Sequence, residues 1–208
     1  MSDPIVPPAT IGMLGGGQLG RYAIVAARTM GYRTVVLDPD PGAPAGRVAD
    51  THVVAAYDDE SALSVLADRC DVVTTEFENP PAAALELLSR RTLVAPSPRA
   101  VAVAQDRIAE KQFLVDCGLP VAPYAVIDSP DADPGVTVPC VLEQALPLQS
   151  EVSVVVARTR DGAFAAYPVA QNRHVGGILD LTVVPADVSR RVADRAAGIA
   201  MTIADQLE

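Results

Sequence analysis

Apolar and polar positions between residues 10 and 95 follow one repeated pattern, in which a short β-branched or apolar run leads through a turn into a helical stretch. Alternation of this kind is typical of parallel strands joined by crossover helices. The pattern predicts a Rossmann-like α/β domain over residues 10–97, after a flexible tail over residues 1–9. The predicted strands are TIGML, YRTVVLD, THVVAAY, DVVTTEF and RTLVAP, and the predicted helices are QLGRYAIVAARTM, DDESALSVLADRC and PPAAALELLSRR.

A helix with a defined start and stop is predicted to follow this domain. Asp106 can cap its first turn, and the helix runs through Cys117. Gly118 suits the position just after a helix end, and Pro120 cannot continue a helix. Lys111, the only lysine in the chain, is predicted to face solvent from this helix.

Strand-like runs dominate the rest of the chain after DSPDADPG, a Pro-, Asp- and Gly-rich stretch that predicts a loop. The turn RDG predicts an antiparallel hairpin, and an amphipathic helix is predicted from about Ala186 to the end. The predicted fold class is therefore α/β, with a Rossmann-like parallel-sheet domain followed by a smaller α+β domain over residues 98–208. The strand-like runs are VPCVLEQ, EVSVVVAR, GAFAAYPV and ILDLTVV.

Length, composition and charge narrow the functional classes. With 208 residues, half of them hydrophobic, the chain can bury a core. Its net charge of −10 disfavours nucleic acid and anionic membrane as partners, because both require a basic surface. No apolar run approaches the ~20 residues of a membrane span, and the first residues lack the basic and apolar regions of a signal peptide. A cytoplasmic protein with small-molecule partners is therefore expected.

The three cysteines, Cys70, Cys117 and Cys140, are far apart in the sequence and form no CxxC pair. Each lies in an apolar setting. We therefore predict buried free thiols at all three positions, and the sequence assigns no metal ligand.

A glycine-rich loop, GGGQLG at residues 15–20, follows the first predicted strand and opens the first predicted helix. This is the context of a phosphate-binding GxGxxG loop, because glycines let a ligand approach the backbone and a helix N-terminus favours an anion. Asp38, after the second strand, is placed to hold the ribose of a dinucleotide. Alone this signal is weak, and a different small ligand fits the loop better than a dinucleotide, with a structural tight turn as the remaining alternative.

A second candidate site lies in the segment EFENP at residues 76–80, at the C-terminal end of a predicted strand. Ligands bind at this edge of open parallel sheets. Glu76 and Glu78 are two residues apart, so their side chains point the same way if the strand continues. Either a substrate contact or a pair of solvated loop charges fits this spacing.

Four segments together resemble the N5-carboxyaminoimidazole ribonucleotide synthetase family, whose members are ATP-grasp ligases of purine biosynthesis. The matches fall in the same order from Ile11 to Pro185 and are far more specific than the glycine loop alone. They imply a pre-ATP-grasp domain followed by an incomplete ATP-grasp domain. The segments are IGMLGGGQLGRYAIVAARTMGYRTVVLDPDPGAPAGRVAD, DVVTTEFENP, SPRAVAVAQDRIAEKQFLVDCGLPVAPY and EVSVVVARTRDGAFAAYPVAQNRHVGGILDLTVVPA.

The resemblance implies a carbon–nitrogen ligase reaction. ATP phosphorylates bicarbonate to carboxyphosphate, and the exocyclic amine of 5-aminoimidazole ribonucleotide captures the carboxyl group, which leaves ADP and phosphate. Gln18, Leu19 and Glu76 would then bind the ribonucleotide rather than a dinucleotide. The resemblance also implies a homodimer.

The resemblance places ATP contacts in the second part of the chain. Arg99 is similar to an arginine that contacts ATP phosphate. An arginine that is simply exposed at the start of a helix would fit the sequence as well. Glu151 matches the carboxylate that binds the nucleotide ribose, a task suited to a charged acceptor. His174 matches a histidine near the nucleotide, although a bystander histidine is the commoner reading of a lone loop histidine. The expected adenine-binding strand is Glu143, Gln144, Ala145 and Leu146.

Three features of the family have no counterpart in this sequence: an ATP-binding lysine on a strand, a GGYDGKG-like loop over the phosphates, and the Mg²⁺ ligands that stabilise phosphoryl transfer. The run VTVPCVLEQALPLQSE passes from the expected lysine strand straight into the adenine-binding strand. We therefore expect an internally deleted and C-terminally truncated member, with ATP and Mg²⁺ as the family's cofactors and no catalytic residue assigned.

Two alternative functions follow from these losses and from the glycine loop. One is a non-catalytic remnant that binds the ribonucleotide or dimerises, and the other is an NAD-binding oxidoreductase. The missing segments also predict exposed apolar surface near residues 140–208, with low solubility or self-association.

Overall fold

The computed structural model describes residues 4–129 and 137–207, and the predicted loop at 128–135 lies largely outside them. The chain divides into two compact units, Met1–Gln105 and Asp106–Glu208. The domain boundary predicted at 97/98 stays a prediction, and the units divide eight residues later. The reason is that the helix α4 (Pro98–Gln105) belongs to the first unit, where the Gln105 side-chain amide donates hydrogen bonds to the carbonyls of Glu78 and Pro80.

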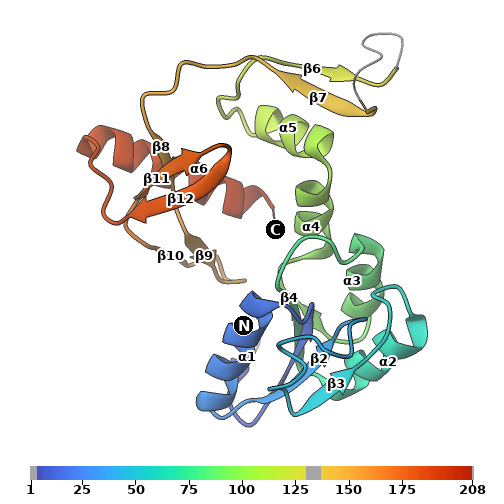
Figure 1. The fold of residues 1–208 in the computed structure, drawn as a ribbon. Coiled ribbons are helices and arrows are strands. Elements are labelled where there is room, and N and C mark those ends of the chain that lie inside the picture. The colour runs from blue at the N-terminus through green and yellow to red at the C-terminus, as the bar shows by residue number, and fades with distance from the viewer. Residues whose placement is uncertain (1–3, 130–136, 208) are drawn as a thin grey trace. The chain divides into compact units, whose positions relative to one another are not determined.

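The first unit is a five-stranded parallel sheet in the order β3-β2-β1-β4-β5, with helices between the strands as predicted (Figure 1). The α4 helix is not among the predicted helices, although a helix start was one alternative for Arg99. The elements are β1 (Thr10–Leu14), α1 (Gln18–Thr29), β2 (Arg33–Leu37), β3 (Thr51–Val53), α2 (Glu60–Arg69), β4 (Val72–Thr75), α3 (Ala82–Ser89), β5 (Leu93–Val94) and α4.

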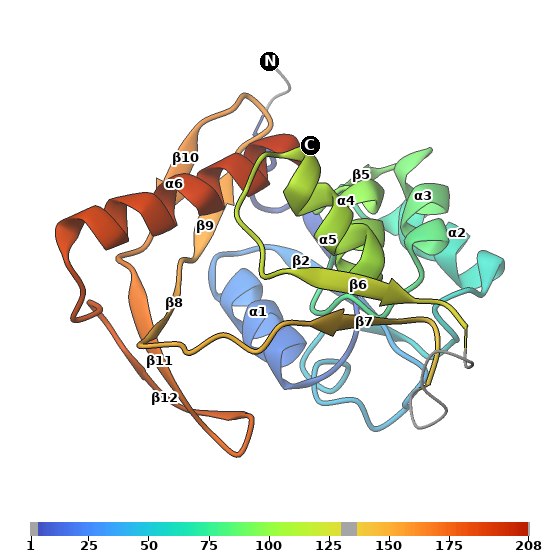
Figure 2. The same ribbon diagram turned by 90° about the horizontal axis from the view of Figure 1, so that it is seen from above.

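The core of the first unit lies on both faces of this sheet, with α1 on one side and α2 and α3 on the other (Figure 2). Neighbouring residues of β1 show the alternation, since Met13 packs with Ile24 of α1 while Leu14 packs with Leu66 of α2 and Leu85 of α3. Side chains of successive strand residues point to opposite faces, so burial on both faces explains the nearly continuous apolar runs of β1 and β2. The alternating pattern therefore gives a sandwich of helix, sheet and helix.

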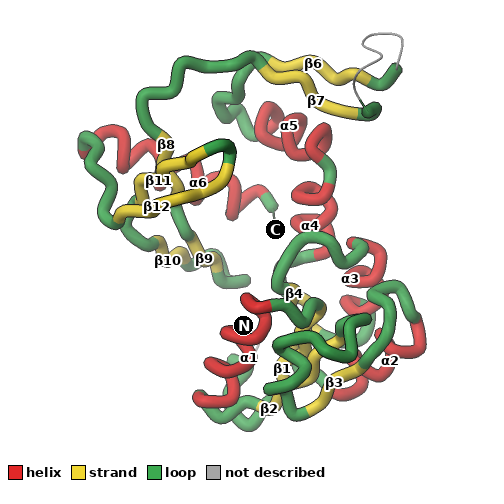
Figure 3. The backbone as a smooth tube through the Cα atoms, viewed as in Figure 1, coloured by secondary structure: helices red, strands yellow, loops and turns green. Residues whose placement is uncertain are grey.

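The second unit combines two helices with three separate antiparallel sheets, β6-β7, β9-β10 and β12-β11-β8 (Figure 3). The predicted RDG hairpin is confirmed as β9-β10. The predicted strand EVSVVVAR divides into β8 and β9, which belong to different sheets, and β6 and β11 were not predicted. The elements are α5 (Arg107–Asp116), β6 (Tyr124–Ile127), β7 (Cys140–Glu143), β8 (Glu151–Ser153), β9 (Val156–Arg158), β10 (Phe164–Ala166), β11 (Ala170–Val175), β12 (Ile178–Val183) and α6 (Arg190–Gln206).

The α5 helix confirms the predicted cap and stop. The Asp106 carboxylate accepts hydrogen bonds from the backbone N–H groups of Ile108 and Ala109, at 2.8 and 3.0 Å. Gly118 has φ +67° just after the helix, in the left-handed region where glycine is favoured. Such side-chain caps typically stabilise a helix by about 1 kcal/mol.

Apolar burial differs between the two units. All buried hydrophobic side chains of the described residues lie between Met13 and Val101, within the first unit. In the second unit large apolar side chains are exposed, which confirms the exposed surface predicted for residues 140–208. They include Leu142, Leu146, Leu148, Tyr167, Val175, Ile178, Leu179, Leu181, Val183 and Val184.

Membrane insertion has no support in the described helices, since none of them combines the length and the apolar character that a transmembrane span needs.

The cysteines are free thiols as predicted, but only Cys70 is buried, while Cys117 and Cys140 are half-buried. Burial, followed by the neighbouring charge of Asp71, raises the pKa of the Cys70 thiol from 9.0 to about 12. Because the thiolate is the reactive form, this shift lowers the thiolate fraction about 1000-fold. In native protein at pH 8 we expect Ellman's reagent to modify Cys117 and Cys140 readily and Cys70 only after unfolding. Equal modification rates for the three thiols in folded protein would contradict this.

Candidate functional site

The glycine loop between β1 and α1 is a tight turn whose backbone N–H groups are bound by side chains of the same unit. Gly15 has φ +103°, and its N–H donates to the Leu37 carbonyl at 3.0 Å. The N–H of Gly17 donates to the Glu76 carboxylate at 2.8 Å, and the N–H of Gly20 donates to the other oxygen of the same carboxylate. A carboxylate from the end of β4 thus lies across the first turn of α1.

Asp38, at the end of β2, occupies the other side of this loop. It is buried, and its carboxylate accepts hydrogen bonds from the N–H of Gly16 at 2.6 Å, the hydroxyl of Tyr57 at 2.8 Å and the N–H of Asp40 at 2.8 Å. Burial, followed by the hydrogen bond to Asp38, raises the pKa of Tyr57 well above its ordinary value of 10. Asp38 is therefore a structural acceptor, whereas the sequence analysis placed it for a ribose.

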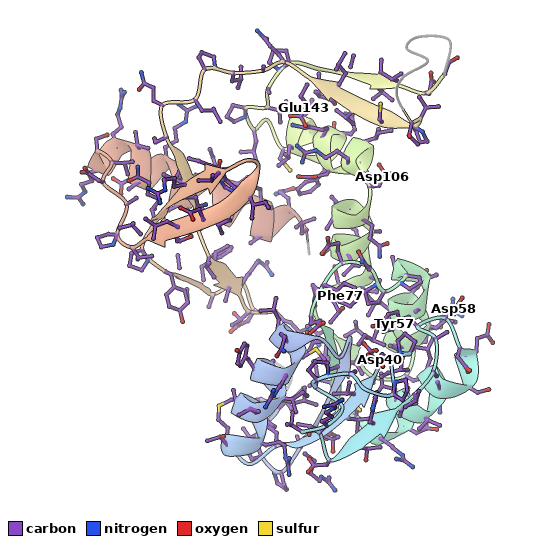
Figure 4. The ribbon with its side chains drawn as sticks, in the orientation of Figure 1. Asp40, Tyr57, Asp58, Phe77, Asp106 and Glu143 are labelled. Carbon is purple, nitrogen blue, oxygen red and sulfur yellow. The ribbon has the colours of Figure 1, made fainter. Side chains whose placement is uncertain are left out.

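Tyr57 is a part of this site that the sequence analysis missed. Its ring packs edge-on against Phe77 at 6.0 Å between centroids, and Figure 4 shows the two side chains together at the edge of the sheet. The only sequence signal is its place as the last residue of the third predicted strand, at the C-terminal edge of a parallel sheet. Side chains at this edge of neighbouring strands lie close together.

A pocket of about 320 Å³ adjoins the carboxylate of Glu76. Its walls are mainly apolar and include two acidic residues, a composition typical of small-molecule sites. Glu76 and Glu78 both line it, but β4 ends at Thr75, so the continuing strand on which their shared direction depended is absent at these residues. The residues that line the pocket are Thr75, Glu76, Phe77, Glu78, Pro96, Ala100, Val101 and Ala104.

Gln18 and Leu19, the other two predicted ribonucleotide contacts, lie in the first turn of α1 and are exposed. The flanking residues Gly17 and Gly20 both donate backbone N–H groups to Glu76, so Gln18 and Leu19 belong to the helical turn that this carboxylate binds. Leu19 keeps 69% of its surface exposed although it is apolar. An exposed apolar side chain next to a polar loop is suited to ligand contact.

Glu151 and His174, two of the predicted nucleotide contacts, meet in the sheet of the second unit. The register pairs Glu151 of β8 with Asn172 of β11, and a bulge between Arg173 and His174 re-aims the histidine. The His174 Nδ1 atom lies 3.2 Å from a carboxylate oxygen of Glu151. Arg99, by contrast, lies in the first unit, exposed in the first turn of α4.

The four predicted adenine-binding residues do not form a single strand. Glu143 ends β7, and residues 144–146 have no regular secondary structure. The Gln144 N–H donates to the Pro123 carbonyl at 2.9 Å, and the Leu146 carbonyl accepts from the Leu148 N–H at 2.9 Å. Antiparallel pairing with β6 stops at Glu143, where Tyr124 is the first residue of β6, which explains why the strand ends there.

Lys111 is buried, so the prediction that it faces solvent was wrong. It is the only described residue of the second unit in the buried class. Its ammonium group lies 2.7 Å from the Glu143 carboxylate, which Arg107 contacts at 2.6 Å, and 6.0 Å from the centre of the Tyr124 ring. The β6-β7 hairpin covers this lysine, and Glu143 supplies the charge that a buried cation needs.

Glu143 should make the second unit acid-sensitive. Hydrogen bonds from Lys111, and then from Arg107, hold the pKa of Glu143 below its ordinary value of 4.5. Because the pKa is lower in the folded state, the ionised Glu143 side chain stabilises the fold above pH ~4.5. This stabilisation is lost as the pH falls through the lowered pKa. We expect Glu143→Gln to lower the melting temperature at pH 7, and the difference from wild type to shrink below pH ~4.5. A difference that does not change with pH would contradict this assignment.

The described residues do not supply a metal centre. No group of three or more His, Cys, Asp or Glu side chains within ranges 4–129 and 137–207 is arranged to hold a metal ion.

Family models match both units. Residues 8–105 match the ribonucleotide synthetase pre-ATP-grasp domain, and residues 130–208 match the ATP-grasp domain. The first match ends at the last residue of the first compact unit.

Relatives in the curated collections are named N5-carboxyaminoimidazole ribonucleotide synthase. The protein from Brucella melitensis is 37% identical over 91% of this chain, and that from Bacillus subtilis is 31% identical over the whole chain. The chain spans 64% and 65% of their respective lengths.

Solved structures agree with these relatives. An ADP complex of N5-carboxyaminoimidazole ribonucleotide synthetase matches the whole chain with a TM-score of 0.91 at 34% identity, and the match covers 65% of that chain. The Staphylococcus aureus synthetase with ADP matches 97% of this chain with a TM-score of 0.86 at 32% identity, over 64% of its own length.

The alignment with the Bacillus subtilis protein also bears on the expected internal deletion. It extends over 247 positions, whereas this chain has 208 residues in all, so about 39 aligned positions have no residue here. A shortfall inside the aligned region agrees with the expected internal deletion.

Proposed function

Because the chain belongs to the family of N5-carboxyaminoimidazole ribonucleotide synthases, we propose that it serves the ATP-dependent carboxylation of 5-aminoimidazole ribonucleotide in purine biosynthesis. The observation that carries the proposal is the match of the whole chain to an ADP complex with a TM-score of 0.91. In this reaction ATP phosphorylates bicarbonate, and the ribonucleotide amine attacks the carboxyphosphate carbon as phosphate leaves.

The first unit is proposed to bind the ribonucleotide through Gln18, Leu19 and Glu76. The support is that the Glu76 carboxylate binds the first turn of α1, which contains Gln18 and Leu19, and that Glu76 lines the mainly apolar pocket of about 320 Å³. A carboxylate and a side-chain amide can bind sugar hydroxyls or an amine, and Leu19 offers apolar contact.

The second unit is proposed to bind the nucleotide through Glu151 and His174, and to contact adenine through residues 143–146. Arg99, which belongs to the first unit, is proposed to contact phosphate. The Glu151–His174 contact of 3.2 Å supports a joint role for the pair. Adenine binding through the backbone of Gln144 would require its hydrogen bond with Pro123 to be exchanged. Mg²⁺ is proposed on family grounds, and no step of the reaction is assigned to a metal.

Assembly and location are proposed from the same family. A homodimer in the cytoplasm is expected. Light scattering on purified protein tests the dimer, and a single mass near 21.6 kDa would exclude it.

The experiment that tests the function is ADP release by the purified chain with ATP, Mg²⁺, bicarbonate and 5-aminoimidazole ribonucleotide. We expect release that depends on the ribonucleotide and stops when bicarbonate is omitted. Absence of release from protein with a native circular dichroism spectrum would reject the carboxylation and leave a binding remnant. A fluorescence titration with NADH tests the oxidoreductase alternative separately, and no binding at millimolar concentration would remove it.

Glu151→Ala tests the nucleotide site. Loss of a charged acceptor typically costs about 1.5 kcal/mol or more, so ATP affinity should fall about tenfold. Isothermal titration calorimetry measures the change, and Asp180→Ala is the matched control, because Asp180 is a carboxylate of the same sheet that pairs with Arg173 instead. Equal affinities for the two variants would remove Glu151 from the site.

A further inference from the structure

The N-terminal end of α1, which would attract an anion, already holds the Glu76 carboxylate. The N–H groups of Gly17 and Gly20 donate to the two oxygens of the Glu76 carboxylate. The first-turn N–H groups of a helix have no intrahelical partner and carry the positive end of its dipole. In glycine-rich phosphate loops these groups bind the ligand's oxygens, and here Glu76 takes that place.

The Glu76 carboxylate packs tightly against the backbone of these glycines. A methyl group built on Gly17 or Gly20 would collide with the Glu76 carboxylate oxygens. The carboxylate is therefore in direct contact with the backbone over both glycines. A phosphate oxygen at the same donors would also meet the negative charge of Glu76 within a few ångströms, where like charges repel.

Asp38 repeats this arrangement on the other side of the loop. It accepts from the Gly16 N–H at 2.6 Å and is buried with Tyr57 as its second donor. A Cβ atom at Gly16 would lie 2.9 Å from the Asp38 Cβ atom. Two carboxylates from different strands thus occupy three N–H groups of the loop.

We propose that Glu76 is a specificity-determining residue whose carboxylate closes the anion-binding end of α1, so that the glycine loop rejects pyrophosphate and dinucleotides despite its GxGxxG-like sequence. The inference does not depend on the proposed carboxylation, because it concerns only which anions the loop admits. Asp38 supports Glu76 by holding the preceding glycine.

The experiment compares wild type with Glu76→Ala, Glu76→Gln and the control Glu78→Gln, using inorganic pyrophosphate in calorimetry and NADH in fluorescence titration. Glu78→Gln removes the same charge two residues away from the same pocket. We expect Glu76→Ala to bind pyrophosphate at least roughly tenfold more tightly than wild type, since an anion at a bare helix N-terminus is stabilised. Glu76→Gln should gain less, because the amide still fills the space.

The backbone amides of Gly17 and Gly20 locate the binding. In ¹H–¹⁵N spectra of Glu76→Ala their signals should shift when pyrophosphate is added, and in wild type they should not. The proposal is overturned if folded Glu76→Ala binds no more tightly than wild type, or if Glu78→Gln gains as much. If Glu76→Ala does not fold, equal binding by Glu76→Gln and wild type overturns it in the same way.

Discussion

Leu14→Ala is expected to lower the free energy of unfolding of the first unit by about 2–5 kcal/mol. Leu14 ends the central strand β1, is fully buried, and packs against Leu66 of α2 and Leu85 of α3. Truncation removes apolar contacts and leaves a cavity in a rigid sandwich. Urea unfolding followed by circular dichroism at 222 nm measures the loss as a lower transition midpoint.

Leu19→Ala is the matched control for this change. It makes the same substitution in the next element, where the leucine is 69% exposed, so the free energy of unfolding should change by less than about 0.5 kcal/mol. Similar losses for Leu14→Ala and Leu19→Ala would mean that the core does not lie where the structure places it.

Gly15→Ala is expected to lower the same free energy of unfolding by about 2–5 kcal/mol in total. A Cβ atom at Gly15 would stand 2.7 Å from both the Glu76 side chain and the Phe77 ring, and the residue has φ +103°. Backbone strain contributes about 1–2 kcal/mol and overpacking about 1–3 kcal/mol. Because the clash displaces Glu76, pocket binding should also be lost, which thermal shift with added ribonucleotide measures.

Gly31→Ala separates the backbone strain from the overpacking. Gly31 also has positive φ, at +92°, but the nearest atom to its added Cβ would be 3.4 Å away, an ordinary contact. This variant should show the strain alone, about 1–2 kcal/mol. If Gly15→Ala is no worse than Gly31→Ala, Glu76 does not press on the loop.

Local pattern was enough to predict the five strands and the helices α1 to α3 of the first unit, but not α4. The central strands of this unit carry nearly continuous apolar runs because both faces of the sheet are buried, so periodicity identifies β1 to β5 without knowledge of their partners. In the second unit the exposed strands lack this strong pattern, and β6 and β11 were missed. The burial of Lys111 was also missed, because it depends on a hairpin that begins 13 residues later in the chain at Tyr124.

The sequence predicted where in the fold the candidate site lies, but not which residues are in contact there. The ends of β1 and β4 had to meet at one edge of a parallel sheet, which put Glu76 near the glycine loop. The pairing of Leu14 with Thr75 then decides that the next residue, Glu76, reaches Gly17 and Gly20, and no sequence pattern specifies that register. The pairing of Glu151 with His174 depends on register and a bulge in the same way.

The order of the strands has a consequence for synthesis on the ribosome. Every strand of the five-stranded sheet, and every buried apolar side chain among the described residues, is encoded before Asp106. Domains emerging from the ribosome fold N-terminal part first. The first half of this chain can therefore complete its sheet during translation, while the exposed strands of the second half are still being made.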